Sequence, residues 1–267
     1  MNTSIRYVVD HRSPLRRFLS WIDLLAWAIL LMGSLFCFNI IQCLSFLFFP
    51  FSRWLVWKIN RECANLWWGF LTFWAEKWLG LQVEFSGDEI PYGENVLLIA
   101  NHQQMPDIPI LMTLAIRKGR LGDMKWYVKD SLKYIPGIGW GMYFLGCVFL
   151  KRNWYADYAN IQKTFARLRN LGVPFWLVSF VEGTRIKPSK LKKAQDYART
   201  KGYPVPQHTL IPKRKGFATA IQELGDRLDA VYDATIFYEQ GIASLSEFGR
   251  GLTRSVKLHV RRFPVSE

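Results

Sequence analysis

The sequence predicts an α/β protein, in which a mixed, mostly parallel sheet flanked by helices is preceded by a two-helix membrane hairpin. Three features carry this prediction: a nearly unbroken apolar stretch over residues 21–51, a tryptophan-rich stretch over residues 53–81, and strand-like runs that alternate with helical ones from residue 81 onward. Alternating strands and helices are typical of α/β sheets. We therefore expect a basic leader and membrane-embedded region over residues 1–80, and a globular domain over residues 81–267.

The hairpin is predicted from the character of the two N-terminal stretches. The first is too long for the core of a signal peptide, no small-residue cleavage pattern follows it, and Pro50 ends it. The second mixes tryptophan with charged residues, as interfacial helices do. Basic residues before the first helix and within the second place both ends on the cytoplasmic side, which fits a hairpin in one leaflet or a pair of full spans. The alternative for the second stretch is a core helix of a soluble domain.

Composition indicates a membrane carrying anionic lipid. Half of the residues are hydrophobic, with 12 Trp and 19 Phe, and the net charge is +14. Tryptophan favours the headgroup region, and Lys and Arg are attracted to its charge. No nucleic-acid module accompanies the basic residues, so we expect no nucleic-acid partner. The cysteines form no CxxC pair, which favours small buried thiols in a reducing compartment and predicts no metal site.

Hydrophobic patterning places the elements of the globular domain in order. Strands are predicted at residues 81–85, 95–100, 124–128, 147–151, 174–181, 209–212, 228–238 and 256–263. Helices are predicted at residues 107–117, 155–171 and 216–224. A lysine run at residues 187–193 is either a solvated face or a contact for acidic lipid or donor phosphates.

The first polar cluster, NHQQMPD at residues 101–107, directly follows an apolar strand. His102 then lies at the carboxyl end of a strand, where open α/β sheets bind ligands. Asp107 reaches the imidazole if it occupies the first turn of the next helix, and Pro106 suits a helix start. A carboxylate on Nδ1 fixes the tautomer and leaves Nε2 as proton acceptor. The alternative is a capping aspartate beside an unrelated histidine, since this spacing alone is common.

The second polar cluster, FVEGTR at residues 180–185, also follows a strand. Gly183 lets the backbone approach a ligand, and its N–H is a candidate donor to an oxyanion. Arg185 offers a planar fork suited to phosphate. Taken alone, the cluster is equally an ordinary turn with a local ion pair between Glu182 and Arg185.

Together these clusters resemble the glycerolipid acyltransferase family, whose members acylate lysophosphatidic acid. GCVFLKR at residues 146–152 resembles the family's G-x-x-F-x-x-R block, and LIPK at residues 210–213 resembles its proline-containing fourth block. The four blocks occur in the family's order and cover roughly residues 95–264. The resemblance implies that residues 81–267 form an acyltransferase catalytic domain.

The resemblance implies direct acyl transfer from a thioester to an alcohol, with His102 as base, Asp107 as its orienting partner and Gly183 as oxyanion donor. The substrate-binding residues it implies are Phe149, Lys151, Arg152, Glu182, Thr184 and Arg185. The two arginines would bind the acceptor phosphate, and Glu182 would position Arg185 or a neighbouring lysine. No GxSxG elbow and no cysteine–histidine pair is visible, which disfavours a covalent acyl-enzyme.

The expected acceptor is 1-acyl-sn-glycerol-3-phosphate, giving phosphatidic acid. Lys151 stands where many members carry an acidic residue, which resembles the lysocardiolipin-acyltransferase branch, so lysophosphatidylglycerol or lysocardiolipin are alternative acceptors. A phospholipid transacylase and a membrane scaffold with a degenerate site are alternative functions. We expect no bound cofactor, acyl-CoA or acyl-carrier protein as donor, and membrane lipids as partners. The absence of organelle signals favours a bacterial inner membrane, with the site on the cytoplasmic side.

Overall fold

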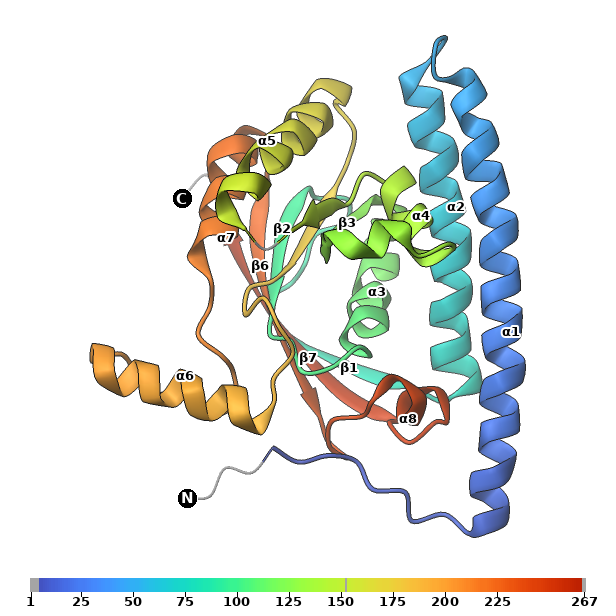
Figure 1. Ribbon diagram of the computed structural model, residues 1–267, viewed down its shortest axis with the longest axis vertical. Coiled ribbons are helices and arrows are strands. Elements are labelled where there is room, and N and C mark those ends of the chain that lie inside the picture. The colour runs from blue at the N-terminus through green and yellow to red at the C-terminus, as the bar shows by residue number, and fades with distance from the viewer. Residues whose placement is uncertain (1–4, 152, 266–267) are drawn as a thin grey trace.

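A seven-stranded sheet forms the centre of the molecule in the computed structural model, which describes residues 5–151 and 153–265 (Figure 1). The strand order is β1-β7-β6-β2-β5-β3-β4, and every neighbouring pair is parallel except β6 and β7. The strands are β1 (Gln82–Gly87), β2 (Val96–Ala100), β3 (Met124–Lys129), β4 (Val148–Leu150), β5 (Trp176–Phe180), β6 (Ala230–Tyr238) and β7 (Ser255–Pro264). The predicted mixed, mostly parallel sheet is confirmed.

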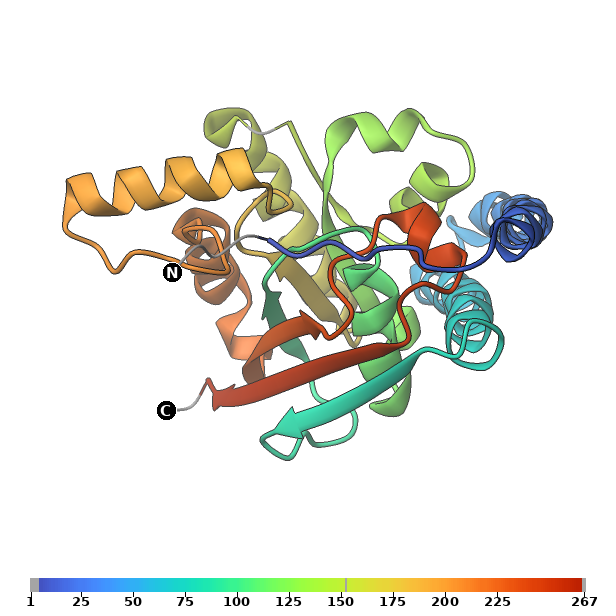
Figure 2. The same cartoon turned by 90° about the horizontal axis from the view of Figure 1, so that it is seen from below.

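Helices cover both faces of this sheet, because the central strands are apolar on both sides. In β2, Leu97 joins the core beneath α5 and α7, whereas Val96 and Leu98 join the core beneath α3. Figure 2 shows α3 and the pair α5 and α7 separated by the sheet. The helices of this domain are α3 (Asp107–Arg117), α4 (Ile138–Phe144), α5 (Trp154–Leu171), α6 (Pro188–Lys201), α7 (Arg214–Leu224) and α8 (Leu245–Gly249).

The N-terminal stretches form two long helices, α1 (Pro14–Ser45) and α2 (Arg53–Phe73), which run side by side at one edge of the domain. A short turn containing Pro50 separates them, and Ser52 caps α2 by accepting the Leu55 N–H at 3.1 Å. A π-helical turn, Trp74–Trp78, continues α2. The chain therefore contains the predicted pair of helices.

The two helices differ in what they contact. Among the described residues, only the helical segment Pro14–Phe48 is long and apolar enough to cross a membrane, and 17% of its most apolar window is buried. Helix α2 lies between α1 and the α/β domain, where Val56 and Trp68 are buried and Arg61 pairs with the buried Asp123 at 2.8 Å. The tryptophan-rich stretch thus has the composition of an interfacial helix, but it also packs against the α/β domain as a core helix would.

The basic leader contacts the far end of the chain. Val8 donates its N–H to Ile242 O at 3.1 Å, and Asp10 forms ion pairs with Arg12 at 2.9 Å and with Arg250 at 2.5 Å. These contacts tie the segment before α1 to residues near α8, so the leader lies against the α/β domain.

One local prediction differs from the structure, and one helix was not predicted. Residues 209–212 form no strand, and the Lys213 N–H that follows them donates to Val181 O at 2.7 Å. The lysine run lies within helix α6, which begins at Pro188 and ends at a left-handed Gly202. A proline at the first helical position and a glycine after the last one are common helix boundaries, so Pro188 and Gly202 are sequence signals for α6.

Candidate active site

The two polar clusters meet because β2 and β5 are parallel neighbours. Ala100 and Phe180, the last residues of these strands, are register partners, so His102 and Glu182 both follow at the same edge of the sheet. A hydrogen bond from Ile186 N–H to His102 O at 2.9 Å joins the two loops. This edge is the carboxyl edge, where α/β sheets bind ligands.

His102 and Asp107 are in direct contact. His102 Nδ1 lies 2.8 Å from Asp107 Oδ2, and the same oxygen accepts the N–H groups of Gln103 at 2.7 Å and Gln104 at 3.0 Å. Helix α3 begins at Asp107, whose side chain is fully buried at the positive end of the helix dipole. A carboxylate held in this way accepts the Nδ1 proton and leaves Nε2 as the basic nitrogen.

Tyr238 is a further partner of Asp107 that the sequence did not indicate. Its hydroxyl donates to Asp107 Oδ1 at 2.5 Å from the last position of β6. Burial, followed by the charge of Asp107, raises the pKa of Tyr238 well above its ordinary value, so the phenol stays protonated and remains a donor. Both oxygens of the carboxylate are therefore bound.

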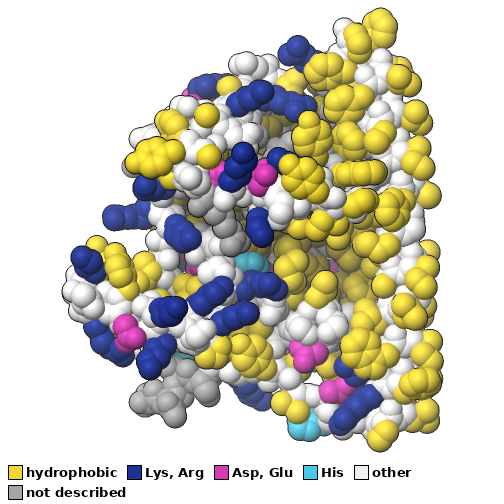
Figure 3. Space-filling view, viewed as in Figure 1, with side chains coloured by type: hydrophobic (Ala, Val, Ile, Leu, Met, Phe, Trp, Pro, Cys, Tyr) yellow, Lys and Arg dark blue, Asp and Glu magenta, His cyan; other side chains and the backbone are white. Residues whose placement is uncertain are grey.

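The imidazole of His102 lies against Phe180, with ring centroids 3.9 Å apart and planes 12° from parallel. This stacking fixes the ring plane, and the bond at Nδ1 fixes its rotation. The side chain is 13% exposed, and no described residue forms a hydrogen bond to Nε2. Figure 3 shows this face hollowed between basic side chains and the apolar two-helix unit, with a histidine side chain in the hollow.

Glu182 supports the loops instead of pairing with Arg185. It is 4% exposed and lies beside the backbone N–H groups of Leu210 and His102, while its Oε2 is buried without a hydrogen-bond partner among the described residues. Burial raises the pKa of Glu182 to about 7, although these two N–H groups act in the opposite direction. The side chain therefore joins the loop of the first cluster to the loop of the fourth.

Gly183 adopts a left-handed conformation with φ +67°, and its N–H donates to Phe180 O at 2.9 Å. That N–H is already used within the turn, so this conformation does not leave it free for the predicted oxyanion role. Gly183 is needed for space as well: a Cβ there would lie 3.1 Å from Lys213 Nζ. The aliphatic and ammonium atoms of Lys213 thus cover the turn.

Cationic groups gather after this turn. Arg185 Nη1 donates to Gln104 Oε1 at 2.6 Å, which links the second cluster to the first. Lys190, from α6, donates to the Thr184 hydroxyl. Together with Lys213, these side chains form a positively charged rim beside His102, suited to a phosphate.

Of the remaining predicted residues, Phe149 lies on β4, an edge strand of the sheet, and Lys151 directly follows that strand. Phe149 is buried, and its carbonyl accepts Asn160 Nδ2 at 2.8 Å. Lys151 is exposed, and its N–H donates to Asp157 at 2.6 Å. Arg152 lies outside the described residues. The structure therefore shows β4 beside β3 but gives no contact between these residues and His102.

The arrangement can perform base catalysis on a hydroxyl held near a phosphate-binding rim. Among the described residues, no three His, Cys, Asp or Glu side chains gather to hold a metal ion. The oriented His–Asp pair and the cations beside it are the chemical features that this edge of the sheet presents.

Comparison with known proteins is consistent with this chemistry. A family model described as Acyltransferase matches residues 82–239. The chain is 36% identical over 236 residues to 1-acyl-sn-glycerol-3-phosphate acyltransferase 3 of Arabidopsis thaliana, which covers 86% of this chain and 63% of that protein. It is 32% identical over 234 residues to the human gamma enzyme of the same name, covering 86% and 62%.

A solved structure shares the fold. The 1-acyl-sn-glycerophosphate (LPA) acyltransferase of Thermotoga maritima aligns with a TM-score of 0.54 over 94% of this chain and 88% of its own, at 19% identity. This chain spans between 52% and 63% of the length of the first plant relatives that it matches. The family match covers more than half of the chain, from β1 to the residue after β6, and includes His102, Asp107 and Glu182. The chain belongs to the acyltransferase family.

Proposed function

We propose that the protein transfers a fatty acyl group from an acyl thioester to the free hydroxyl of 1-acyl-sn-glycerol-3-phosphate, producing phosphatidic acid. The observation that carries this proposal is the His102–Asp107 pair beside a rim containing Arg185. Relatives at 32–36% identity bear the name of this activity, which supports the choice of acceptor.

In the proposed reaction, His102 Nε2 takes the proton of the acceptor hydroxyl while its oxygen attacks the thioester carbonyl. The carbon–sulfur bond then breaks, and the thiolate leaves with the proton from the imidazolium. Asp107 stabilises that imidazolium and holds the ring in place. The backbone N–H groups of Thr184 and Arg185 form no hydrogen bond with a described residue, and they replace Gly183 as candidate oxyanion donors.

Arg185 and Lys190 are proposed to bind the acceptor phosphate, because Arg185 bonds Gln104 of the His102 loop and Lys190, from α6, bonds Thr184 beside it. The link from Arg185 to Gln104 presents the guanidinium to the same space as the imidazole. Phe149, Lys151 and Arg152 keep their predicted substrate-binding role as part of this proposal. The donor, acyl-CoA or acyl-carrier protein, and the absence of a bound cofactor remain predictions.

We further propose that the two helices attach the protein to the cytoplasmic side of a membrane, with α1 in the lipid. Apolar side chains on α1 are widely exposed, among them Leu25 at 63%, Ile29 at 66% and Ile40 at 60%. A water-soluble protein rarely leaves so large a continuous apolar surface uncovered. The bacterial inner membrane remains a prediction.

The proposed reaction is tested by supplying detergent-purified protein with labelled oleoyl-CoA and a panel of lysophosphatidic acid, lysophosphatidylglycerol and monolysocardiolipin. The proposal predicts labelled phosphatidic acid as the main product. Product from monolysocardiolipin alone would contradict the assigned acceptor. Label that appears only when an intact phospholipid is the acyl donor would identify a transacylase instead.

A further inference from the structure

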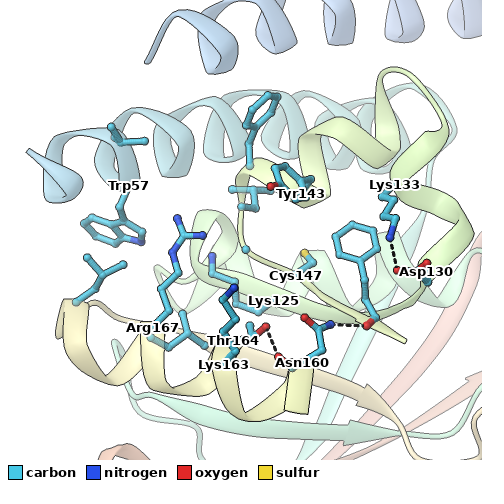
Figure 4. Close-up of a pocket in the computed structure, with 17 residues that line it drawn as sticks. Trp57, Lys125, Asp130, Lys133, Tyr143, Cys147, Asn160, Lys163, Thr164 and Arg167 are labelled. Carbon is cyan, nitrogen blue, oxygen red and sulfur yellow. Dashed lines mark hydrogen bonds and ion pairs between the residues drawn. The ribbon is translucent and has the colours of Figure 1, made fainter. Parts of the chain in front are cut away.

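A cavity of about 280 Å³ lies between α2, the start of β4 and α5. It is lined by Trp57 of α2, Lys125 of β3 and Arg167 of α5, among others (Figure 4). Trp126 contacts Phe180, the ring that stacks on His102, with centroids 6.1 Å apart. Because successive strand residues point to opposite faces, Lys125 points away from that side. The cavity is thus on the other face of β3 from the His102 site.

Lys125 is a buried cation without a partner. Its side chain is 1% exposed, points into the cavity and forms no hydrogen bond or ion pair with any described residue. Burial lowers the pKa of Lys125, and the charge of Arg167 acts in the same direction. A protein rarely keeps an unpaired ammonium inside, because desolvation of a charge is costly unless another charge compensates it.

Further donors line the same cavity. Lys163 and Arg167, which lie on one face of α5, form no hydrogen bond or ion pair with a described residue, and Figure 4 shows their nitrogens directed into the same space as Lys125. Trp57 Nε1 is buried and has no acceptor among the residues that the structure describes. Three cationic side chains and an indole N–H therefore surround one space, which is the chemistry of a phosphate or carboxylate site.

The neighbouring carboxylates are already used. Asp130, at one end of the cavity, pairs with Lys133 at 2.8 Å, and Asp123 pairs with Arg61 at 2.8 Å. The charge of Asp123 still acts on Lys125, but no described carboxylate forms an ion pair with Lys125, Lys163 or Arg167.

The rest of the lining is apolar and belongs partly to the hairpin. Val56 of α2, Leu168 and Leu171 of α5, and Phe144 and Leu145 all line the cavity. An inorganic phosphate would leave this surface unused. A phospholipid would satisfy both parts, since its phosphate binds the cations and its glycerol and acyl groups contact the apolar wall.

We propose that this cavity binds the phosphate group of an intact anionic phospholipid, at a second lipid site formed by α2, β3 and α5. This site goes beyond the proposed acyl transfer, because its cations, Lys125, Lys163 and Arg167, have no part in that reaction; of the residues proposed to bind the substrate, Phe149 also lines the cavity. A lipid bound there would hold the α/β domain against the membrane through α2, the helix that lies between that domain and α1.

The test measures binding, so it does not depend on the proposed reaction. Full-length protein in an uncharged detergent is titrated calorimetrically with dioctanoyl phosphatidylglycerol, with dioctanoylglycerol, which lacks phosphate, and with inorganic phosphate. We expect saturable binding of the phosphatidylglycerol and none of the dioctanoylglycerol. Lys125→Met and Arg167→Gln should each weaken binding about tenfold, as loss of a charged hydrogen-bond donor does.

Matched variants separate this site from the surface and from the His102 cleft. Lys192→Met makes the same change at an exposed lysine of α6 and should bind like the wild type. Arg185→Gln should also leave binding intact. Lys125→Met removes a buried charge, so its Tm without lipid should equal or exceed that of the wild type.

Three outcomes would overturn the proposal. The first is a folded Lys125→Met variant that binds phosphatidylglycerol with wild-type affinity. The second is loss of binding in Arg185→Gln but not in Lys125→Met, which would place the lipid in the His102 cleft. The third is inorganic phosphate that binds as tightly and displaces the lipid, which would identify a soluble phosphate as the ligand.

Discussion

His102 Nδ1 lies 2.8 Å from Asp107 Oδ2, an oxygen that also accepts the N–H groups of Gln103 and Gln104. The carboxylate is therefore fixed by the loop that carries the histidine. Tyr238 holds its other oxygen from a strand 131 residues away. The pair is held by both local and long-range contacts.

Removal of the Tyr238 hydroxyl should impair catalysis without abolishing it. Tyr238→Phe leaves Asp107 Oδ1 without its donor, and a hydrogen bond to a charged group contributes roughly 1.5–3 kcal/mol. We expect kcat for acyl transfer to fall about tenfold or more while KM changes little, since Tyr238 positions Asp107 and touches no substrate. Tyr232→Phe is the matched control, because that equally buried β6 hydroxyl bonds Glu94. Equal kcat losses in the two variants would contradict the positioning role.

Gly183→Ala should disturb the turn at Lys213. Gly183 and Gly202 share φ +67°, but an added Cβ would meet Lys213 at 3.1 Å only at position 183, whereas nothing lies within 4 Å at position 202. Both substitutions strain the backbone by roughly 1 kcal/mol. We expect Gly183→Ala alone to raise KM for the acceptor several-fold, measured by initial rates. Wild-type kinetics in that variant would show that the Lys213 position is irrelevant to binding.

Arg185 should affect acceptor binding through its charge. Arg185→Gln removes the guanidinium that is linked to Gln104, and we expect KM for lysophosphatidic acid to rise about tenfold, with a smaller effect on an acceptor that lacks phosphate. Arg199→Gln, at an exposed arginine of α6 that pairs with Asp196, is the control and should be neutral. An equal rise in KM for lysophosphatidic acid and for the acceptor without phosphate would mean that Arg185 does not recognise phosphate.

Glu182 should make stability depend on pH in a defined window. Its pKa is raised from 4.5 to about 7, so the folded state retains a proton that the unfolded state has lost. The contribution of Glu182 is therefore fully present below pH 4.5 and is lost as pH rises through 7, by about 3 kcal/mol. Glu182→Gln keeps an acceptor for the N–H groups of His102 and Leu210 but carries no charge.

The Tm difference between Glu182→Gln and wild type measures this effect. We expect the variant to gain stability over the wild type between pH 5 and pH 8. Glu89→Gln changes an exposed carboxylate and is the control: its Tm difference from the wild type should be the same at pH 5 and at pH 8. A Glu182→Gln difference that did not change with pH would be inconsistent with a buried carboxyl of raised pKa.

The sequence predicted those site residues whose positions follow from the strand or helix next to them in the chain. His102 and Glu182 each follow an apolar strand, and parallel pairing of β2 with β5 brings such positions together. Asp107 was predicted from its place at a helix start. Phe180 belongs to the second cluster, although its stacking on the imidazole depends on tertiary structure.

Long-range contacts account for what was missed. Tyr238 ends an apolar strand, and nothing in that pattern indicates that its hydroxyl reaches Asp107. The hydrogen bond from the Gly183 N–H to Phe180 O forms only in the folded turn. The sequence alone therefore leaves that N–H as a candidate oxyanion donor. Lys125 lies within a predicted strand, but only the packing of α2 and α5 shows that it faces a cavity instead of solvent.

The central claim is that His102 is the base for acyl transfer, and one comparison tests it most directly. Labelled oleoyl transfer from oleoyl-CoA to lysophosphatidic acid is measured for wild type, His102→Ala and His259→Ala, each with its Tm. His259 lies exposed on β7 beside Ser86 and has no contact with Asp107. We predict a loss of roughly 10²–10⁴-fold in kcat for His102→Ala and wild-type turnover for His259→Ala. A folded His102→Ala protein that kept near-normal turnover would contradict the account.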